Sequence, residues 1–210
     1  MAPKARLQAL GHPLGNRRAL DPGPAFCEAT NRQVTETKRV VVTGPESTGK
    51  TTLAKRLAER FGARWVPEYV RAYLESLPPR DPLSLVFYED VEPIARGQIA
   101  AEDDAAAAGG LIICDTDLHS TRVYSDHYFG RSPEWVKAAA RSRPYDLHLL
   151  LDVDLPWTPD PMRDRPFDRE EMLRAFEAEL QAANRRVIRI RGLGDARFTE
   201  GEAAVAALLV

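Results

Sequence analysis

The sequence predicts an α/β fold in which a five-stranded parallel sheet is covered by helices on both faces. Short runs of Val, Ile and Leu alternate along the chain with longer segments in which apolar residues recur at helical spacing. Helices that connect parallel strands produce this alternation. Within the short runs the apolar residues occupy successive positions, which is typical of strands buried on both faces. The 210 residues suit one domain with a single core.

Each predicted element has local boundary signals. The strands are predicted at residues 38–43, 63–67, 111–114, 146–153 and 186–191. The helices are predicted at residues 50–61, 69–77, 83–108, 117–129, from 133 onward, at 168–184 and at 199–210. Pro67 ends the second strand, and Gly109 and Gly110 end the long third helix. Asp117 is the expected N-cap of the next helix, and Pro133 opens the one after it.

Composition limits the domain organisation and the partners. Residues 1–37 are rich in Pro, Gly and Arg without a sustained period, so we expect a flexible tail before a folded domain at 38–210. A net charge of −2 argues against a nucleic-acid partner, and the longest apolar runs are too short to cross a membrane. The two cysteines lack CxxC spacing, which favours a reducing, cytoplasmic location. The oligomeric state stays open, a homo-oligomer included.

The loop between the first strand and the first helix fits the pattern G-x-x-x-x-G-K-[ST] of P-loop NTPases. Its residues are Gly44, Pro45, Glu46, Ser47, Thr48, Gly49, Lys50 and Thr51, followed by Thr52. Glycines let the backbone curl so that its N–H groups face phosphate oxygens, and the helix adds its positive end. We expect Lys50 to reach the β- and γ-phosphates of ATP and Thr51 to ligate Mg²⁺. A plain turn is the alternative, but the strand before the loop and the helix after it argue against one.

The remaining motifs favour a phosphotransferase over a switch or a motor. A guanine-reading N-K-x-D is absent from the sequence, and the third strand ends in Asp-Thr-Asp rather than Asp-Glu. The segment 155–167 after the fourth strand is rich in Pro and bears arginines, as in the lid of a small-molecule kinase. Such a lid closes over the phosphates and expels water, so that transfer outcompetes hydrolysis.

Three carboxylates follow predicted strands, where ligands gather in parallel sheets. Glu68 follows the second strand and could orient or deprotonate an acceptor hydroxyl; a surface glutamate is the alternative. Asp115 ends the third strand, at the usual place of a second Mg²⁺ carboxylate. Asp117 could accept hydrogen bonds from substrate hydroxyls, or it could act only as a helix N-cap.

The lid segment and two helices offer further candidates. Arg163 and Arg165 could stabilise charge on the transferred group and on the phosphates, or could be solvated. Trp157 at the root of the lid, with Tyr69, could stack on a flat heterocycle, although core packing is the alternative for any aromatic. Gln98 is a lone amide in its helix and could read an amide-bearing base.

Four segments together resemble a known family. They are "TGPESTGKTTLAKRLA", "WVPEYVRAYL", "LIICDTDLHSTRVYSDHYFG" and "DLPWTPDPMRD". Over residues 38–200 the chain resembles the ribosylnicotinamide kinase domain of the bacterial trifunctional NAD-biosynthesis regulators, a P-loop domain of AAA type. Each motif alone is weak, but their order with the phosphate loop is specific.

The resemblance implies transfer of the γ-phosphoryl group of ATP to the 5′-hydroxyl of nicotinamide riboside, giving nicotinamide mononucleotide. It places Lys50 and Thr51 at the phosphates and Mg²⁺, and Asp115 on the metal side. Glu68 and Asp117 then face the acceptor, while Trp157 and Arg163 fall in the lid. In the lid, Pro161 stands where the family is expected to have glycine.

Full-length family members also carry a helix-turn-helix and an adenylyltransferase domain before the kinase. Here 37 residues precede it, so DNA binding and adenylylation are not implied. The expected function is thus an ATP-dependent kinase with a small nucleoside-like acceptor. A kinase for another nucleoside, nucleotide or alcohol, and a regulatory ATPase that signals through a partner, are the alternatives.

Overall fold

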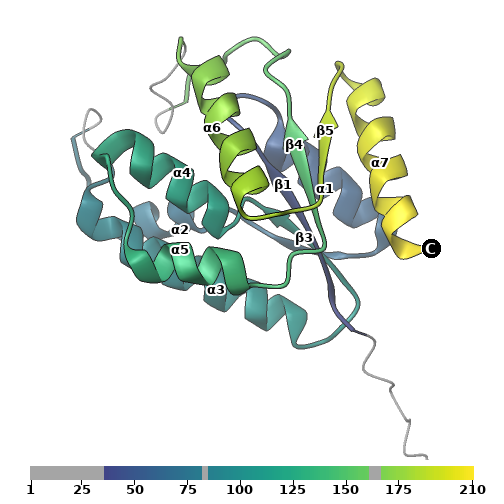
Figure 1. The fold of residues 1–210 in the computed structure, drawn as a ribbon, viewed down its shortest axis with the longest axis horizontal. Helices are drawn as coiled ribbons and strands as arrows, with labels where there is room; N and C mark the ends of the chain where they lie inside the picture. The colour runs from purple at the N-terminus through teal and green to yellow at the C-terminus, as the bar shows by residue number, and fades with distance from the viewer. Residues whose placement is uncertain (1–35, 82–84, 161–166) are drawn as a thin grey trace, which may run out of the picture. The chain divides into compact units, whose positions relative to one another are not determined.

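The computed structural model describes residues 36–81, 85–160 and 167–210, and these form the predicted α/β fold (Figure 1). Five parallel strands make one sheet in the order β2-β3-β1-β4-β5. The strands are β1 (Lys38–Thr43), β2 (Arg64–Val66), β3 (Leu111–Asp115), β4 (Leu147–Leu151) and β5 (Val187–Ile190). The predicted five-stranded parallel sheet is therefore confirmed.

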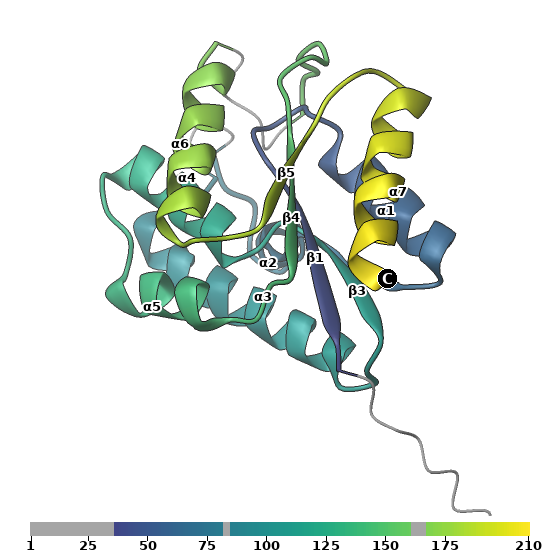
Figure 2. The ribbon, with the colours of Figure 1, turned by 45° about the vertical axis from the view of Figure 1, so that its right-hand side comes forward.

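Helices cover both faces of the sheet (Figures 1 and 2). They are α1 (Lys50–Phe61), α2 (Tyr69–Glu75), α3 (Val91–Ala106), α4 (Leu118–Phe129), α5 (Glu134–Ser142), α6 (Arg169–Ala182) and α7 (Asp195–Leu209), with a short 3₁₀ turn, η1 (Tyr88–Asp90). Val40 and Val42 of β1 pack with α1 and α7, whereas Val41 between them belongs to a core cluster against α3. This alternation follows from the period of two in a strand. Among the described helices, none has the length and apolar composition that a bilayer crossing requires.

The register of the central strands brings their carboxyl ends together. Val42 pairs with Asp115 of β3, and Thr43 pairs with Leu150 of β4. The next residue, Gly44, has a φ of 132°, and a Cβ there would stand 2.9 Å from the carbonyl oxygen of Leu151. A side chain does not fit at this position, so glycine lets the chain turn out of β1 directly into the phosphate loop.

Three helices begin one residue later than predicted, and two begin four or more residues away from the predicted start. The long helix predicted from residue 83 begins at Val91, after η1. The carboxylate of Asp90 accepts hydrogen bonds from the backbone N–H of Phe87 (2.8 Å) and the hydroxyl of Tyr73 (2.7 Å), which fixes a turn before α3. The last helix begins at Asp195 rather than at residue 199, directly after Gly194, whose φ is 55°.

The predicted tail lies almost wholly outside the described residues, and a flexible tail at 1–37 therefore stays a prediction. Its last residue, Thr37, is described, and its hydroxyl donates a hydrogen bond to the carbonyl oxygen of Ala106 (3.0 Å) at the end of α3. The folded unit thus begins at least one residue before β1.

A buried carboxylate, Glu102 on α3, ties that helix to the segment before β4. Its side chain is fully buried. It accepts hydrogen bonds from the hydroxyl of Tyr145 (2.9 Å), from Nε of Arg143 (3.0 Å) and from Nε2 of Gln98 (3.2 Å). Burial raises the pKa of Glu102 to about 7, against the opposing charge of Arg143. These donors satisfy the carboxylate that the fold encloses.

Gly97 on α3 lies directly under the ring of Tyr69 on α2, and a Cβ at this position would overlap that ring. We expect Gly97→Ala to lower the free energy of unfolding by about 1–3 kcal/mol, because the ring must move out of its place. Gly201→Ala on α7 is the matched control, since its Cβ would meet only the ends of the side chains of Leu53, at 3.2 Å, and Leu57, at 3.6 Å. Urea unfolding measures both variants. Equal stability of Gly97→Ala and the wild type would contradict the described packing of α2 on α3.

The raised pKa of Glu102 predicts a dependence of stability on pH. In the folded state the carboxyl group of Glu102 has a pKa of about 7, well above the ordinary value of a glutamate. The contribution of Glu102 to the stability of the folded state is therefore fully present below the pKa that Glu102 has in the unfolded chain. It is lost as the pH rises through the pKa of Glu102 in the folded state. We expect the stability of the wild type relative to Glu102→Gln to fall between about pH 5 and about pH 8, by roughly 1.4 kcal/mol for each unit of pKa difference.

Urea unfolding of both proteins across this pH range measures the effect. Asp104→Asn is the control, because it removes an exposed carboxylate from the same helix. A difference between wild type and Glu102→Gln that stays constant with pH would show that Glu102 has the same pKa in the folded and unfolded states.

Candidate active site

One cavity of about 510 Å³ lies at the carboxyl ends of the strands. Residues 46–52, from the phosphate loop into α1, line part of it. Glu68 after β2, Thr116 after β3 and residues of α2, α3 and α4 line it as well. A single space therefore connects the phosphate loop with a second pocket between three helices.

The phosphate loop has the curled backbone that anion binding requires. Ser47 and Gly49 have positive φ values of 55° and 82°, and Gly49 is the N-cap of α1. The hydroxyl of Thr48 and the ammonium of Lys50 each donate a hydrogen bond to the carbonyl oxygen of Pro45, at 2.8 Å. Alternating backbone conformations at a helix N-terminus turn several N–H groups toward one point.

Two arginines that were not predicted as site residues donate hydrogen bonds to backbone carbonyl oxygens of this loop. Arg169 at the start of α6 donates to the carbonyl oxygens of Glu46 (3.1 Å) and Ser47 (3.2 Å). Arg197 of α7 donates to the carbonyl oxygen of Thr48. Both guanidinium groups are buried. No local pattern could have revealed them, because their partners lie more than a hundred residues away in the sequence.

Asp115 stands behind the first turn of α1, as predicted for a metal-side carboxylate. Its side chain is 2% exposed, and Thr51 is hydrogen-bonded to it. Burial raises the pKa of Asp115, while the hydrogen bond from Thr51 and the charge of Lys50 oppose the rise. Its Oδ1 is buried without a hydrogen-bond partner in the described part of the chain. The Thr51 hydroxyl and the Asp115 carboxylate, of which one oxygen is unsatisfied, form an oxygen-rich donor set that suits Mg²⁺.

Glu68 is among the residues that line the cavity, and its role toward an acceptor stays a prediction. It is the N-cap residue of α2, and its Oε2 lies 3.7 Å from Nε of Arg71. The guanidinium of Arg71 also pairs with Asp160, at 3.4 Å, in the segment after β4. Arg71 therefore links the Glu68 region with the root of the predicted lid.

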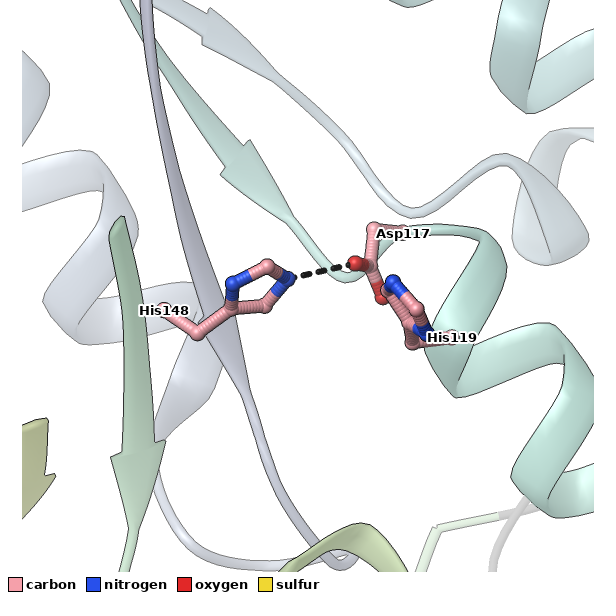
Figure 3. Close-up of side chains that lie close together, drawn as sticks. All are labelled: Asp117, His119 and His148. Atoms are coloured by element: carbon pink, nitrogen blue, oxygen red, sulfur yellow. Dashed lines mark hydrogen bonds and ion pairs between the residues drawn. The ribbon is translucent and has the colours of Figure 1, made fainter. Parts of the chain in front are cut away.

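Asp117 does not reach the cavity, which corrects the expectation that it binds substrate hydroxyls. Its side chain is fully buried. Its Oδ2 accepts a hydrogen bond from Nε2 of His148 (2.9 Å) on β4 (Figure 3). Its Oδ1 accepts one from the backbone N–H of Ser120 (2.9 Å). Burial opposes ionisation, but His148 and Ser120 stabilise the charge, and the pKa of Asp117 falls to about 2. Asp117 is instead the N-cap of α4, which is the alternative that the sequence left open.

His119 completes a buried cluster with Asp117 and His148, the three residues drawn in Figure 3. Their possible ligand atoms lie within 4.8 Å of one another. However, Nδ1 of His119 donates to Glu179 on α6 (2.8 Å), and Nε2 accepts from Arg185 (3.0 Å). Since both nitrogens of His119 are engaged, we assign the cluster as a hydrogen-bond network that joins α4 to β4 and α6.

The lid candidates fall into two groups. Arg163 and Arg165 lie outside the described residues, so their roles stay predictions. Trp157 is described: its indole N–H donates to Oε1 of Glu46 (2.7 Å), in the phosphate loop. It is not among the described residues that line the cavity. This hydrogen bond therefore joins the first residues of the predicted lid to the phosphate loop. The geometry gives no support to stacking of Trp157 on an acceptor base.

The helical pocket has aromatic walls. Tyr69, Tyr124 and Tyr128 line it, as do Phe87 and Phe129, which sequence reasoning missed. The rings of Tyr124 and Tyr128 lie nearly parallel, with their centroids 6.1 Å apart. Spacing on α4 predicts that residues 124 and 128 share a helix face, but the approach of Phe87 from another segment depends on tertiary packing.

Gln98, whose amide was predicted to read an amide-bearing base, is among the residues that line this pocket. It is 2% exposed. Its Oε1 accepts a hydrogen bond from the backbone N–H of Tyr69 (3.1 Å), and its Nε2 donates to Glu102 (3.2 Å). The amide therefore joins the first turn of α2 to the buried carboxylate of α3.

Comparisons with known proteins agree with this architecture. A family model described as "AAA domain" matches residues 39–197. The "Trifunctional NAD biosynthesis/regulator protein NadR" of Escherichia coli strain K12 is 31% identical over 156 residues, which are 73% of this chain and 38% of that protein. The protein of the same name from Salmonella typhimurium strain LT2 is 34% identical over 127 residues, 60% of this chain and 31% of that protein. This chain therefore spans less than half the length of these relatives.

Solved structures show the same fold. A crystal structure of "NadR protein in complex with NR" has a TM-score of 0.69 and 25% identity, covering 82% of this chain and 51% of that one. A second, "in complex with NAD and AMP-PNP", has a TM-score of 0.65 and 25% identity, covering 82% and 49%. A thymidylate kinase from Ehrlichia chaffeensis shares the fold, with a TM-score of 0.55, 17% identity and coverage of 82% and 99%.

The family resemblance seen in the sequence is thus confirmed. The family model begins in β1, includes the phosphate loop and continues through β5 into α7. Since it matches well over half of the chain, this protein belongs to the AAA domain family of P-loop proteins and has NadR proteins among its relatives.

Proposed function

We propose that this protein is an ATP-dependent kinase that phosphorylates the 5′-hydroxyl of nicotinamide riboside. The observation that carries the proposal is the single cavity that is lined by the phosphate loop, by Glu68 and by several aromatic side chains. Such a layout suits a donor at one end, an acceptor at the other and transfer in the middle. The related NadR structures, one in complex with NR and one with NAD and AMP-PNP, support a riboside acceptor and an ATP donor.

At the donor end, the backbone N–H groups of the loop and the N-terminus of α1 bind the phosphates of ATP. The Lys50 ammonium adds a charge at the transferring group, where negative charge is spread in the transition state. Mg²⁺, when held by the Thr51 hydroxyl and the Asp115 carboxylate, supplies further positive charge to the phosphate oxygens.

At the acceptor end, the aromatic walls suit nicotinamide riboside because its pyridinium ring is flat and positively charged. The faces of Tyr124, Tyr128 and Tyr69 carry negative electrostatic potential and attract a cation. Glu68 lines the same cavity, and in this proposal its carboxylate orients the ribose hydroxyl and accepts its proton. Residues 155–167, which include Arg163 and Arg165, act as the lid in this proposal and exclude water.

An acceptor panel tests the function. We expect release of ADP from ATP to be strongly stimulated by nicotinamide riboside, with a phosphorylated riboside detected by mass spectrometry. The panel includes deoxynucleosides, nucleoside monophosphates and small alcohols. Stimulation by one of these instead would establish a kinase for another acceptor. ATP hydrolysis that ignores every acceptor would support a regulatory ATPase and contradict the proposal.

Replacement of Glu68 tests the mechanism. We expect Glu68→Gln to lower kcat by about 10²–10⁴-fold, because the amide cannot accept the hydroxyl proton. ATP affinity should be unchanged, since the phosphate loop is intact. Glu75→Gln on α2 is the matched control, because Glu75 is exposed and lies outside the cavity lining. Single-turnover kinetics and ATP titration measure the two quantities, and near wild-type turnover in Glu68→Gln would remove Glu68 from the reaction.

A further inference from the structure

We infer that Gln98 donates a hydrogen bond to the acceptor base, and that Glu102 and the backbone of Tyr69 fix the Gln98 amide in the required orientation. The site therefore requires a hydrogen-bond-accepting group, such as a carbonyl oxygen, on that base. The inference rests on the proposed function, because it concerns the acceptor end of the same cavity. It assigns a specificity residue, Gln98, and a positioning residue behind it, Glu102.

The orientation of the Gln98 amide follows from its two partners. Amide oxygen and nitrogen look alike to most structural methods, so the assignment must come from the hydrogen bonds. The backbone N–H of Tyr69 can only donate, and it meets the amide at 3.1 Å. The carboxylate of Glu102, when ionised, can only accept, and it meets the amide at 3.2 Å. One orientation satisfies both partners: oxygen toward Tyr69 and nitrogen toward Glu102.

The surroundings of Glu102 keep it an acceptor. The Tyr145 hydroxyl (2.9 Å) and Nε of Arg143 (3.0 Å) donate to it as well, so three donors converge on one fully buried carboxylate. Asp117 adds a nearby negative charge and Arg143 a positive one. Burial raises the pKa of Glu102 to about 7, but a protonated carboxyl still retains a carbonyl oxygen that can accept from Gln98. The orientation of Gln98 thus holds in both protonation states.

The amide retains one N–H for a ligand. A primary amide has two N–H bonds, and Glu102 takes one of those on Gln98. For the other, the described residues supply no partner. Gln98 lines the cavity with Val91 and Ile94, which lie on the same face of α3 at helical spacing. On this apolar wall, Gln98 is the one polar side chain of α3 among the described lining residues, and such isolated polar groups set orientation and specificity in ligand pockets.

The fixed orientation of the Gln98 amide determines which group on the base can bind to it. If Gln98 flipped, its nitrogen would face the Tyr69 N–H and its oxygen would face the Glu102 carboxylate, leaving both contacts repulsive. A base with a carbonyl oxygen at this point is bound, and a base without any accepting group leaves the buried N–H unsatisfied. In nicotinamide riboside the carboxamide oxygen supplies the acceptor, and the carboxamide NH₂ is not needed for this contact.

Three ribosides and the full chain test the inference. They carry pyridine with a carboxamide, pyridine with an acetyl group in its place, and unsubstituted pyridine. We expect kcat/KM for the acetyl compound to be within about 3-fold of the carboxamide compound, because both present a carbonyl oxygen. The unsubstituted compound should be lower by roughly 5- to 100-fold, mainly through KM, which is the range for an unsatisfied buried donor.

Two variants assign the effect to these residues. Gln98→Met, which keeps the length but removes the donor, should remove most of the difference between the acetyl and unsubstituted compounds. Glu102→Gln, whose side chain still offers an accepting oxygen, should keep the order of the three compounds, whereas Glu102→Leu should shrink the difference.

Each outcome separates the two proposals. The inference is overturned if the acetyl compound is as poor as the unsubstituted one while the carboxamide compound is phosphorylated, or if Gln98→Met keeps the wild-type ratio. The wild-type panel alone decides the first of these, so the test survives a variant that fails to fold. If none of the three ribosides is phosphorylated while another acceptor is, the proposed function fails and this inference fails with it.

Discussion

The structure depends on the register of β1 between β3 and β4. Pairing of Val42 with Asp115 and of Thr43 with Leu150 ends three strands at one level. The turn after β1 then passes so close to Leu151 that only glycine fits at position 44. As a result, the phosphate loop and the metal-side carboxylate meet at the same edge of the sheet. A shift of one residue would turn the alternating faces of the strand inside out and separate these groups.

Hydrogen bonds between buried polar groups link the aligned strands to the helices. His148 on β4 bonds to Asp117, Asp117 bonds to Ser120, and the hydroxyl of Ser120 lies 2.9 Å from that of Thr43 at the end of β1. A chain of hydrogen bonds thus links two strands to the first turn of α4, which forms a wall of the cavity. Because each of these bonds is sheltered from water, loss of one partner leaves a buried group unsatisfied and costs about 1–3 kcal/mol.

A second polar chain serves the opposite wall. Glu102 holds Gln98, and Gln98 holds the backbone of Tyr69, the residue next to Glu68. The two chains place α2, α3 and α4 around one pocket, while the loop itself is held from behind by Arg169 and Arg197. The phosphate loop therefore offers mainly backbone groups to the cavity, whereas the pocket between the helices is lined by side chains.

Local patterns in the sequence predicted the order of the helices and strands and the polar residues that follow the strand ends. The phosphate loop, Glu68 and Asp115 could be predicted because spacing along the chain fixes where a strand stops and which residue follows it. Only the tertiary structure decided that Asp117 is enclosed by His148, that Trp157 bonds to Glu46, and that Gln98 is oriented by Glu102 and Tyr69. Glu102 lies one turn after Gln98 on α3, at a spacing that the sequence shows, but the other partners come from distant or separately packed segments. Their approach is set by helix packing on the sheet and has no local pattern in the sequence.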